Sequence, residues 1–186
     1  QKMKNMLDIL LRLQQADGSF PRKFRDDFTI VDTSGGSTPS ATLPLVMGYK
    51  YFKDKRYLAS AKQTADYLEK VLISKADYFS STLDANCEDK EASLYAATAT
   101  YYLSLITKGD EHRHYADLTK KAAYFALSWY YVWDVPFAQG QMLGDIGLKT
   151  RGWGNVSVEN NHIDVFVFEF ASVLRWLSKE YAEPRF

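Results

Sequence analysis

The sequence predicts a single all-α domain of helical hairpins, with about six long helices in its 186 residues. Three observations carry this prediction. Apolar residues recur at helical spacing in several long segments, and nearly uncharged segments alternate with amphipathic ones. Short links alternate with long connections between these segments. Finally, residues 56–67 match residues 114–125 at an offset of 58 positions, as expected for stacked helical hairpins.

The first helix is expected at residues 2–15, where Met and Leu recur at helical spacing. Asp17 and Gly18 end this helix because both favour turns, and Pro21 prevents it from resuming. A long connection that is rich in turn-forming residues then reaches to about Thr38.

A hairpin of two helices follows. Its first helix is expected at residues 40–52 and is nearly uncharged. Pro44 lies in or near the first turn, where a missing N–H group costs little. A tight link leads into the second helix at residues 56–74, whose charged residues lie away from its apolar stripe and meet solvent.

A second hairpin is expected to follow the same plan. After another long connection, a helix at residues 87–107 is small, aromatic and apolar beyond Glu91, which predicts burial on most sides. A short link leads to an amphipathic helix at residues 114–133. The longest connection, residues 134–160, precedes a last and mostly apolar helix at residues 161–181.

The internal repeat falls on the second helix of each hairpin. Each repeated unit is a nearly uncharged helix, a short link and an amphipathic helix, so neighbouring units can cover each other's apolar faces. The matched pairs are Tyr57 and Tyr115, Lys62 and Lys120, Ala65 and Ala123, and Tyr67 and Phe125.

The alternation of links also places the candidate site. Helices joined by a short link are antiparallel, so the long connections before the nearly uncharged helices all fall at one end. Functional residues usually lie on such loops over a rigid scaffold. We therefore expect the site in segments 32–42, 84–91 and 151–164, at the N-terminal ends of the buried helices.

Composition excludes several classes of protein. The 23 basic and 23 acidic residues cancel, so no global field attracts nucleic acid or an anionic membrane. No apolar run reaches the roughly 18 residues of a membrane helix, and no signal peptide is visible. The single cysteine, Cys87, excludes an internal disulfide and a cysteine-based metal site. The many aromatic residues are either core residues, which their number favours, or a stacking surface for sugars.

Four acidic residues crowd the start of the second nearly uncharged helix: Asp84, Glu88, Asp89 and Glu91. Cleavage of a glycosidic bond requires two carboxyl groups, one of which donates a proton. Glu88 and Glu91 would share a helix face, with Asp89 directed elsewhere. Alternatively, these acids only stabilise the helix dipole, with Asn86 as the N-cap. We take Glu88 and Asp89 as catalytic candidates, and Asp84 and Glu91 as substrate-binding candidates.

The longest connection and the start of the last helix supply a second set of candidates. Trp153 lies between two glycines, and its indole is suited to stack on a sugar ring. His162 and Asp164 are catalytic candidates because both can exchange a proton. Arg151 and Asn161 are candidates for substrate binding, and Arg151 suits an acidic group such as a uronate. Alternatively, the asparagines cap the last helix and His162 bonds a loop.

Neither a metal nor a cofactor is expected. His162 and Asp164 lack the spacing of a helical zinc motif, and no second pair of ligands is visible in the sequence. A triad of Ser157, His162 and Asp164 would lack the nucleophile-elbow sequence.

The alternating helices, the hairpin repeat and the aromatic-rich long loops resemble the (α/α) toroid proteins, and among them the six-hairpin glycosidase-like group. The segment Gln14–Phe20 (QQADGSF) is similar to a turn found across helical toroids, including terpene cyclases and some pectate-degrading lyases. The resemblance implies a toroid whose active cleft lies where the inner helices begin. A full toroid has six hairpins and this chain would supply about three. Residues 1–186 are therefore expected to be part of a larger toroid, or a half that pairs with a second chain.

The resemblance implies a carbohydrate-active enzyme that cleaves glycosidic bonds in a poly- or oligosaccharide, as a glycoside hydrolase or, second, a polysaccharide lyase. Two alternatives stay open. One is a non-catalytic helical-repeat or glycan-binding module, and the other is a terpene- or prenyl-type toroid enzyme. The expected partner is a carbohydrate substrate, without nucleic acid or membrane insertion. Polysaccharide degradation would favour a periplasmic or extracellular location.

Overall fold

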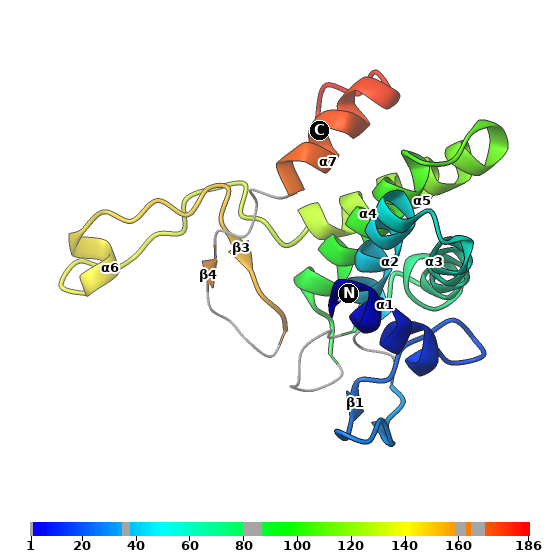
Figure 1. Cartoon of the computed structure of the whole chain (residues 1–186). Helices are drawn as coiled ribbons and strands as arrows, with labels where there is room; N and C mark the ends of the chain where they lie inside the picture. Colours follow the sequence, from blue (N-terminus) through cyan, green and yellow to red (C-terminus); the bar gives the residue numbers. More distant parts are fainter. Residues whose placement is uncertain (1, 35–37, 80–86, 159–162, 165–169) are drawn as a thin grey trace.

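The computed structural model describes residues 2–34, 38–79, 87–158, 163–164 and 170–186. Helices dominate the described chain, which confirms the all-α prediction (Figure 1). The helices are α1 (Lys2–Leu13), α2 (Thr38–Phe52), α3 (Lys55–Tyr67), the π-helix η1 (Leu68–Ile73), α4 (Lys90–Ser104), α5 (Gly109–Leu127), α6 (Met142–Asp145) and α7 (Phe170–Glu180). Two short antiparallel pairs join β1 (Lys23–Phe24) to β2 (Ile30–Asp32), and β3 (Gly154–Asn155) to β4 (Ile163–Asp164).

Two helical hairpins form the centre of the molecule. Only Lys53 and Asp54 separate α2 from α3, and residues 105–108 separate α4 from α5. α2 packs against α4, while α1 contacts α2 and α3, and α7 contacts α4 and α5. The two predicted hairpins are therefore confirmed. In the described part of the chain, the single helices α1 and α7 flank them, within the ranges 2–15 and 161–181 in which the sequence predicts single helices.

Small side chains bring the helices of the second hairpin close together. α4 is lined with buried alanines, and the buried side of α5 is similar. The hydroxyl of Thr119 donates to the hydroxyl of Thr100 over 2.9 Å, and both threonines are fully buried. A hydroxyl that is hydrogen-bonded can be buried at little cost, so this pair is compatible with the buried interface between α4 and α5. The buried alanines are Ala92, Ala96, Ala97 and Ala99 on α4, and Ala116, Ala122, Ala123 and Ala126 on α5.

The internal repeat corresponds to α3 and α5. Tyr57 and Tyr115 are buried, with 0% and 4% of their surface exposed, and the matched alanines, Ala65 and Ala123, are buried as well. The two matched lysines are both half-buried. Matched burial at matched positions confirms that the two hairpins are built on one pattern.

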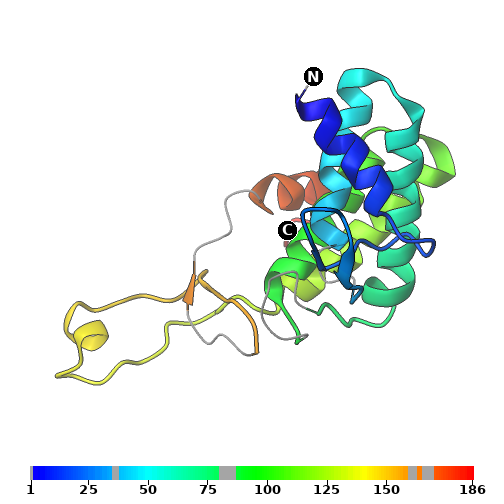
Figure 2. The ribbon, with the colours of Figure 1, turned by 60° about the horizontal axis from the view of Figure 1, so that its bottom comes forward.

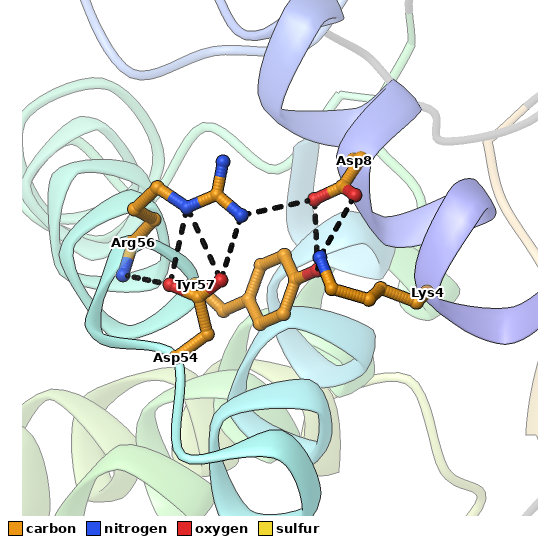
Figure 3. Close-up of polar contacts among 5 residues, drawn as sticks. All are labelled: Lys4, Asp8, Asp54, Arg56 and Tyr57. Atoms are coloured by element: carbon orange, nitrogen blue, oxygen red, sulfur yellow. Dashed lines mark hydrogen bonds and ion pairs between the residues drawn. The ribbon is translucent and has the colours of Figure 1, made fainter. Parts of the chain in front are cut away.

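A polar cluster joins α1 to the start of α3 (Figure 3). The hydroxyl of the fully buried Tyr57 donates to Asp8 Oδ1 over 2.8 Å, and Lys4 Nζ lies 3.0 Å from Asp8 Oδ2. Asp54 caps α3 by accepting the Arg56 N–H, and the Arg56 side chain contacts both Asp54 and Asp8. The side-chain hydrogen bond from Arg56 is the largest cause that lowers the pKa of Asp54 to about 2.

The turn after α1 is locked against α3. Gly18 has a φ angle of +92°, and a Cβ atom there would lie 2.2 Å from the carbonyl oxygen of Gln63. Only glycine satisfies both conditions. Gln14 Nε2 donates to Thr64 Oγ1 and to the Ser60 carbonyl, each over 2.9 Å. These contacts give the segment Gln14–Phe20 a structural role in holding α1 in place.

Residues 128–158 form an arm that projects from the helical body and carries α6 away from it (Figures 1 and 2). Its two sides pair near the base, where the Tyr131 N–H donates to the Trp153 carbonyl and the Gly152 N–H donates to the Tyr131 carbonyl. Asp134 accepts the backbone N–H groups of Thr150 and Arg151. None of the α6 residues is buried, so no core holds this outer part of the arm.

Several predicted helix boundaries are wrong. α4 begins at Lys90 rather than at residue 87, because Glu88 and Asp89 form extended bridges. α5 begins at Gly109 rather than at residue 114. α5 ends at Leu127 rather than near residue 133, because Tyr130 forms an extended bridge to Gly154 across the base of the arm. The last helix is predicted from residue 161, but residues 163–164 form β4 and α7 begins at Phe170.

Candidate functional site

The base of the arm meets the N-terminus of α4 in a small extended layer. Glu88 bridges to Phe79 on one side, and Asp89 bridges to Ser157 of the arm on the other. The Lys90 N–H donates to the Val156 carbonyl over 2.9 Å, and the Val158 N–H donates to the Glu88 carbonyl over 3.2 Å. The structure therefore brings together two of the segments in which the sequence predicts the site.

Asp89 is the N-cap of α4. Its Oδ1 accepts the backbone N–H of Glu91 over 2.6 Å, and only 2% of the residue is exposed. This corrects the interpretation of Asn86 as the cap and of Glu88 and Glu91 as residues on one helix face, since Glu88 precedes the helix. Capping gives Asp89 a structural role, while its catalytic role stays a prediction.

Glu88 is half-buried beside Tyr78. Burial is the largest cause of the raised pKa of the Glu88 carboxyl, and the nearby carboxylate of Asp77 raises it further. A hydrogen bond from the Tyr78 N–H to Glu88 Oε2, over 3.1 Å, opposes this rise. A carboxyl group that keeps its proton to higher pH is suited to proton donation.

Lys90 lies fully buried between the helical body and the arm. Its ammonium nitrogen is 5.4 Å from the centroid of the Tyr130 ring, within the range of a cation–π contact. A Cβ atom on Gly154 would lie 2.8 Å from this nitrogen and 3.1 Å from Tyr130 Cε1. The absence of a side chain at Gly154 thus leaves the space that Lys90 occupies.

An aromatic groove of about 380 Å³ opens at the start of the arm. It is lined by residues 127–133 together with Asn155, and so includes Trp129, Tyr130, Tyr131 and Trp133. Within the described chain, the buried indole nitrogen of Trp129 has no hydrogen-bond partner. The sequence shows this run of aromatic residues, but the predicted helix 114–133 would have distributed them around a helix instead of along one groove.

Trp153 and Arg151 lie in the arm. Trp153 is half-buried, whereas the sequence suggests an exposed indole. The Arg151 side chain is 71% exposed, with its guanidinium 3.7 Å from the carboxylate of Asp134. The backbone hydrogen bond from Arg151 is the largest cause that lowers the pKa of Asp134. These contacts stabilise the base of the arm and leave Arg151 accessible to solvent.

The other candidates are only partly placed. Glu91 lies in the first turn of α4 and is half-buried. Asp164 belongs to β4 and pairs through its backbone with Gly154, so its predicted place at the start of a helix is wrong. Asp84, Asn161 and His162 lie outside the described residues. Among the residues that are described, no three His, Cys, Asp or Glu side chains are grouped so that they could hold a metal ion.

Two histidines of α5, His112 and His114, contact neighbouring helices. His112 Nδ1 lies 2.8 Å from the Ser104 carbonyl, and its Nε2 lies 3.0 Å from Glu180 of α7. His114 Nε2 lies 3.0 Å from Glu69 of η1. The hydrogen bond to the Ser104 carbonyl is the largest cause of the raised pKa of His112, and Glu180 adds to it. These contacts connect α5 to α4, α7 and η1.

Comparison of the chain with models of known protein families gave no match, and comparison of the structure with solved structures gave none either. Within the described residues, no helix is both long and apolar enough to cross a membrane.

Proposed function

We propose that the chain belongs to a carbohydrate-active enzyme that binds a saccharide in the aromatic groove and cleaves a glycosidic bond beside it. The observation that carries this proposal is the groove itself, where four aromatic side chains gather at the base of the arm. Flat apolar rings with polar edges suit the faces of sugar rings. The likeness of the hairpin pattern to (α/α) toroid glycosidases agrees with it.

Glu88 is the proposed proton donor. It forms part of the extended layer at the start of α4. The groove residues connect to the same region, because Tyr130 bridges to Gly154 and the Asn155 N–H donates to the Trp129 carbonyl. The raised pKa of Glu88 favours the protonated form that an acid catalyst requires. Asp164 is the proposed second carboxyl, because its backbone pairs with Gly154 of the same layer. His162 stays a proposed catalytic residue, and Arg151 and Trp153 stay proposed contacts to the substrate.

A glycan-binding module without catalysis is the second candidate. The capping role of Asp89 favours it, because that carboxyl already has a structural task. In this case the aromatic groove would bind the saccharide and Glu88 would only contact Tyr78. The two candidates share the groove and differ in the role of Glu88.

The proposal is tested with soluble poly- and oligosaccharides of three kinds: neutral β-glucans, xylans and uronate-rich chains. Binding is measured by calorimetry and cleavage by release of reducing ends. Trp133→Ala should weaken binding by about tenfold, since it removes one stacking ring. Glu88→Gln should leave binding intact and lower cleavage by about 10²- to 10⁴-fold.

Matched controls lie on the helical body. Tyr51→Ala removes an aromatic residue that is 76% exposed there, and Glu111→Gln neutralises an acid on α5. Neither should change binding or cleavage. Cleavage that is unchanged in Glu88→Gln would overturn Glu88 as the proton donor. Saccharide binding without any cleavage by the wild type, weakened in Trp133→Ala, would leave the binding module, and no saccharide binding by the wild type would end both candidates.

A further inference from the structure

We infer that Lys90 is a positioning residue that sets the geometry of the aromatic groove through the ring of Tyr130. The inference rests on the proposed function for what the groove binds, but not for how Lys90 acts. It starts from the complete burial of a lysine at the N-terminus of α4.

A buried ammonium group is costly unless its surroundings compensate for the charge. At this position the Tyr130 ring faces the nitrogen at 5.4 Å. The negative face of an aromatic ring attracts a cation, most strongly where water is excluded. The contact therefore favours the observed position of the Tyr130 ring.

Gly154 supports the same conclusion from the other side. Any side chain at this position would meet Lys90 Nζ, Lys90 Cδ and Tyr130 Cε1, each within 3.1 Å. Lys90, Tyr130 and Gly154 thus pack at one point, where the arm crosses the start of α4. Tyr130 is also a lining residue of the groove, so a shift at this point moves one wall of it.

The backbone adds a second connection. The N–H of Lys90 donates to the carbonyl of Val156 in the arm, and Asp89 bridges to Ser157. This part of the contact does not depend on the side chain of Lys90. Removal of the ammonium group should therefore alter the position of the Tyr130 ring while the arm stays attached.

The test uses Lys90→Met, which keeps the apolar stem and removes the charge, and Lys90→Arg, which keeps the charge. The first readout needs no ligand: the ring resonances of Tyr130 in protein labelled with ¹³C-tyrosine. We expect these resonances to shift from their wild-type positions in Lys90→Met and to lie close to them in Lys90→Arg. If Lys90 only filled space, Lys90→Met would shift the resonances less than Lys90→Arg, because Met matches the length of the Lys stem and Arg is bulkier.

The second readout is affinity for cellohexaose, xylohexaose and hexagalacturonate. Lys90→Met should weaken whichever of these the wild type binds by about tenfold, and a Tyr130→Leu background should abolish that difference. Lys62→Met, which removes a half-buried lysine that pairs with Glu111 on the body, is the control and should change neither readout.

The outcomes separate the two proposals. If none of the hexasaccharides binds, the proposed function fails, and the Tyr130 resonances still decide the role of Lys90. If Lys90→Met leaves the Tyr130 resonances in place, the positioning role is overturned even where a saccharide binds. If Lys90→Met is unfolded by circular dichroism, the charge-retaining Lys90→Arg decides: unchanged Tyr130 resonances support the role, and displaced resonances in a folded protein overturn it.

Discussion

The helical body and the arm are held by different forces. In the body, residues such as Leu45 and Leu103 are completely buried, and each helix packs on at least two others. In the arm, Met142 of α6 is 75% exposed and Ile146, the C-cap of α6, is 67% exposed. Backbone hydrogen bonds near the base hold the arm together. The body can therefore tolerate change in its surface, whereas the arm depends on a few contacts at its base. The groove lies where these two regions meet.

The largest expected difference concerns apolar side chains. Leu45→Ala should lower the free energy of unfolding by about 2–5 kcal/mol, because it opens a cavity in a fully packed core. Ile146→Ala in the arm should change it by less than about 0.5 kcal/mol. Chemical denaturation followed by circular dichroism measures both values. An equal loss in the two variants would mean that the arm has a core of its own.

Two glycines with positive φ angles sharpen the comparison. Gly18→Ala in the body should cost about 2–4 kcal/mol, because it adds a clash with the Gln63 carbonyl to the backbone strain. Gly147→Ala in the arm meets nothing within 4 Å and should cost only about 1 kcal/mol of strain. Denaturant midpoints give the comparison, and a Gly147→Ala variant as unstable as Gly18→Ala would contradict it.

The smallest expected effect is on pH dependence, and it has opposite signs in the two regions. His112 in the body has a raised pKa. Its contribution to the stability of the fold is therefore complete below about pH 6.5 and is lost as the pH rises through the folded-state pKa. Asp134 in the arm has a lowered pKa. Its contribution to the stability of the folded arm is therefore present above about pH 4 and is lost as the pH falls through the folded-state pKa.

Two measurements check these signs. The advantage in melting temperature of the wild type over His112→Gln should be larger at pH 5.5 than at pH 8. Amide exchange near Thr150, corrected for the intrinsic dependence on pH, should show less protection at pH 2.5 than at pH 5. The same trend in Asp134→Asn would assign the loss of protection to another group.

Much of the body could be predicted from the sequence, because apolar spacing and the repeat are local signals. The link of Lys53 and Asp54 and the matched Tyr57 and Tyr115 are examples. The arm could be predicted only as a long connection, since its form depends on pairing between residues such as Tyr131 and Trp153 that are far apart in the sequence.

The candidate site was predictable in place but not in detail. The meeting of Asp89 with Ser157 agrees with the expectation that long connections gather at one end. The buried position of Lys90 could not be read from a residue type that is usually exposed. The strand at Asp164 could not be predicted either, because a short apolar run suits helix and strand equally.

The position of α1 has a consequence for self-association. Leu7 of α1 packs against Gly48 and Tyr57, where a Cβ atom on the glycine would lie 2.6 Å from Leu7 Cδ1. α1 therefore covers part of the surface of α2 and α3, and Lys4 and Asp8 give its covering face polar ends. A protease cut between α1 and α2 would uncover this surface and favour aggregation before the rest of the fold is lost.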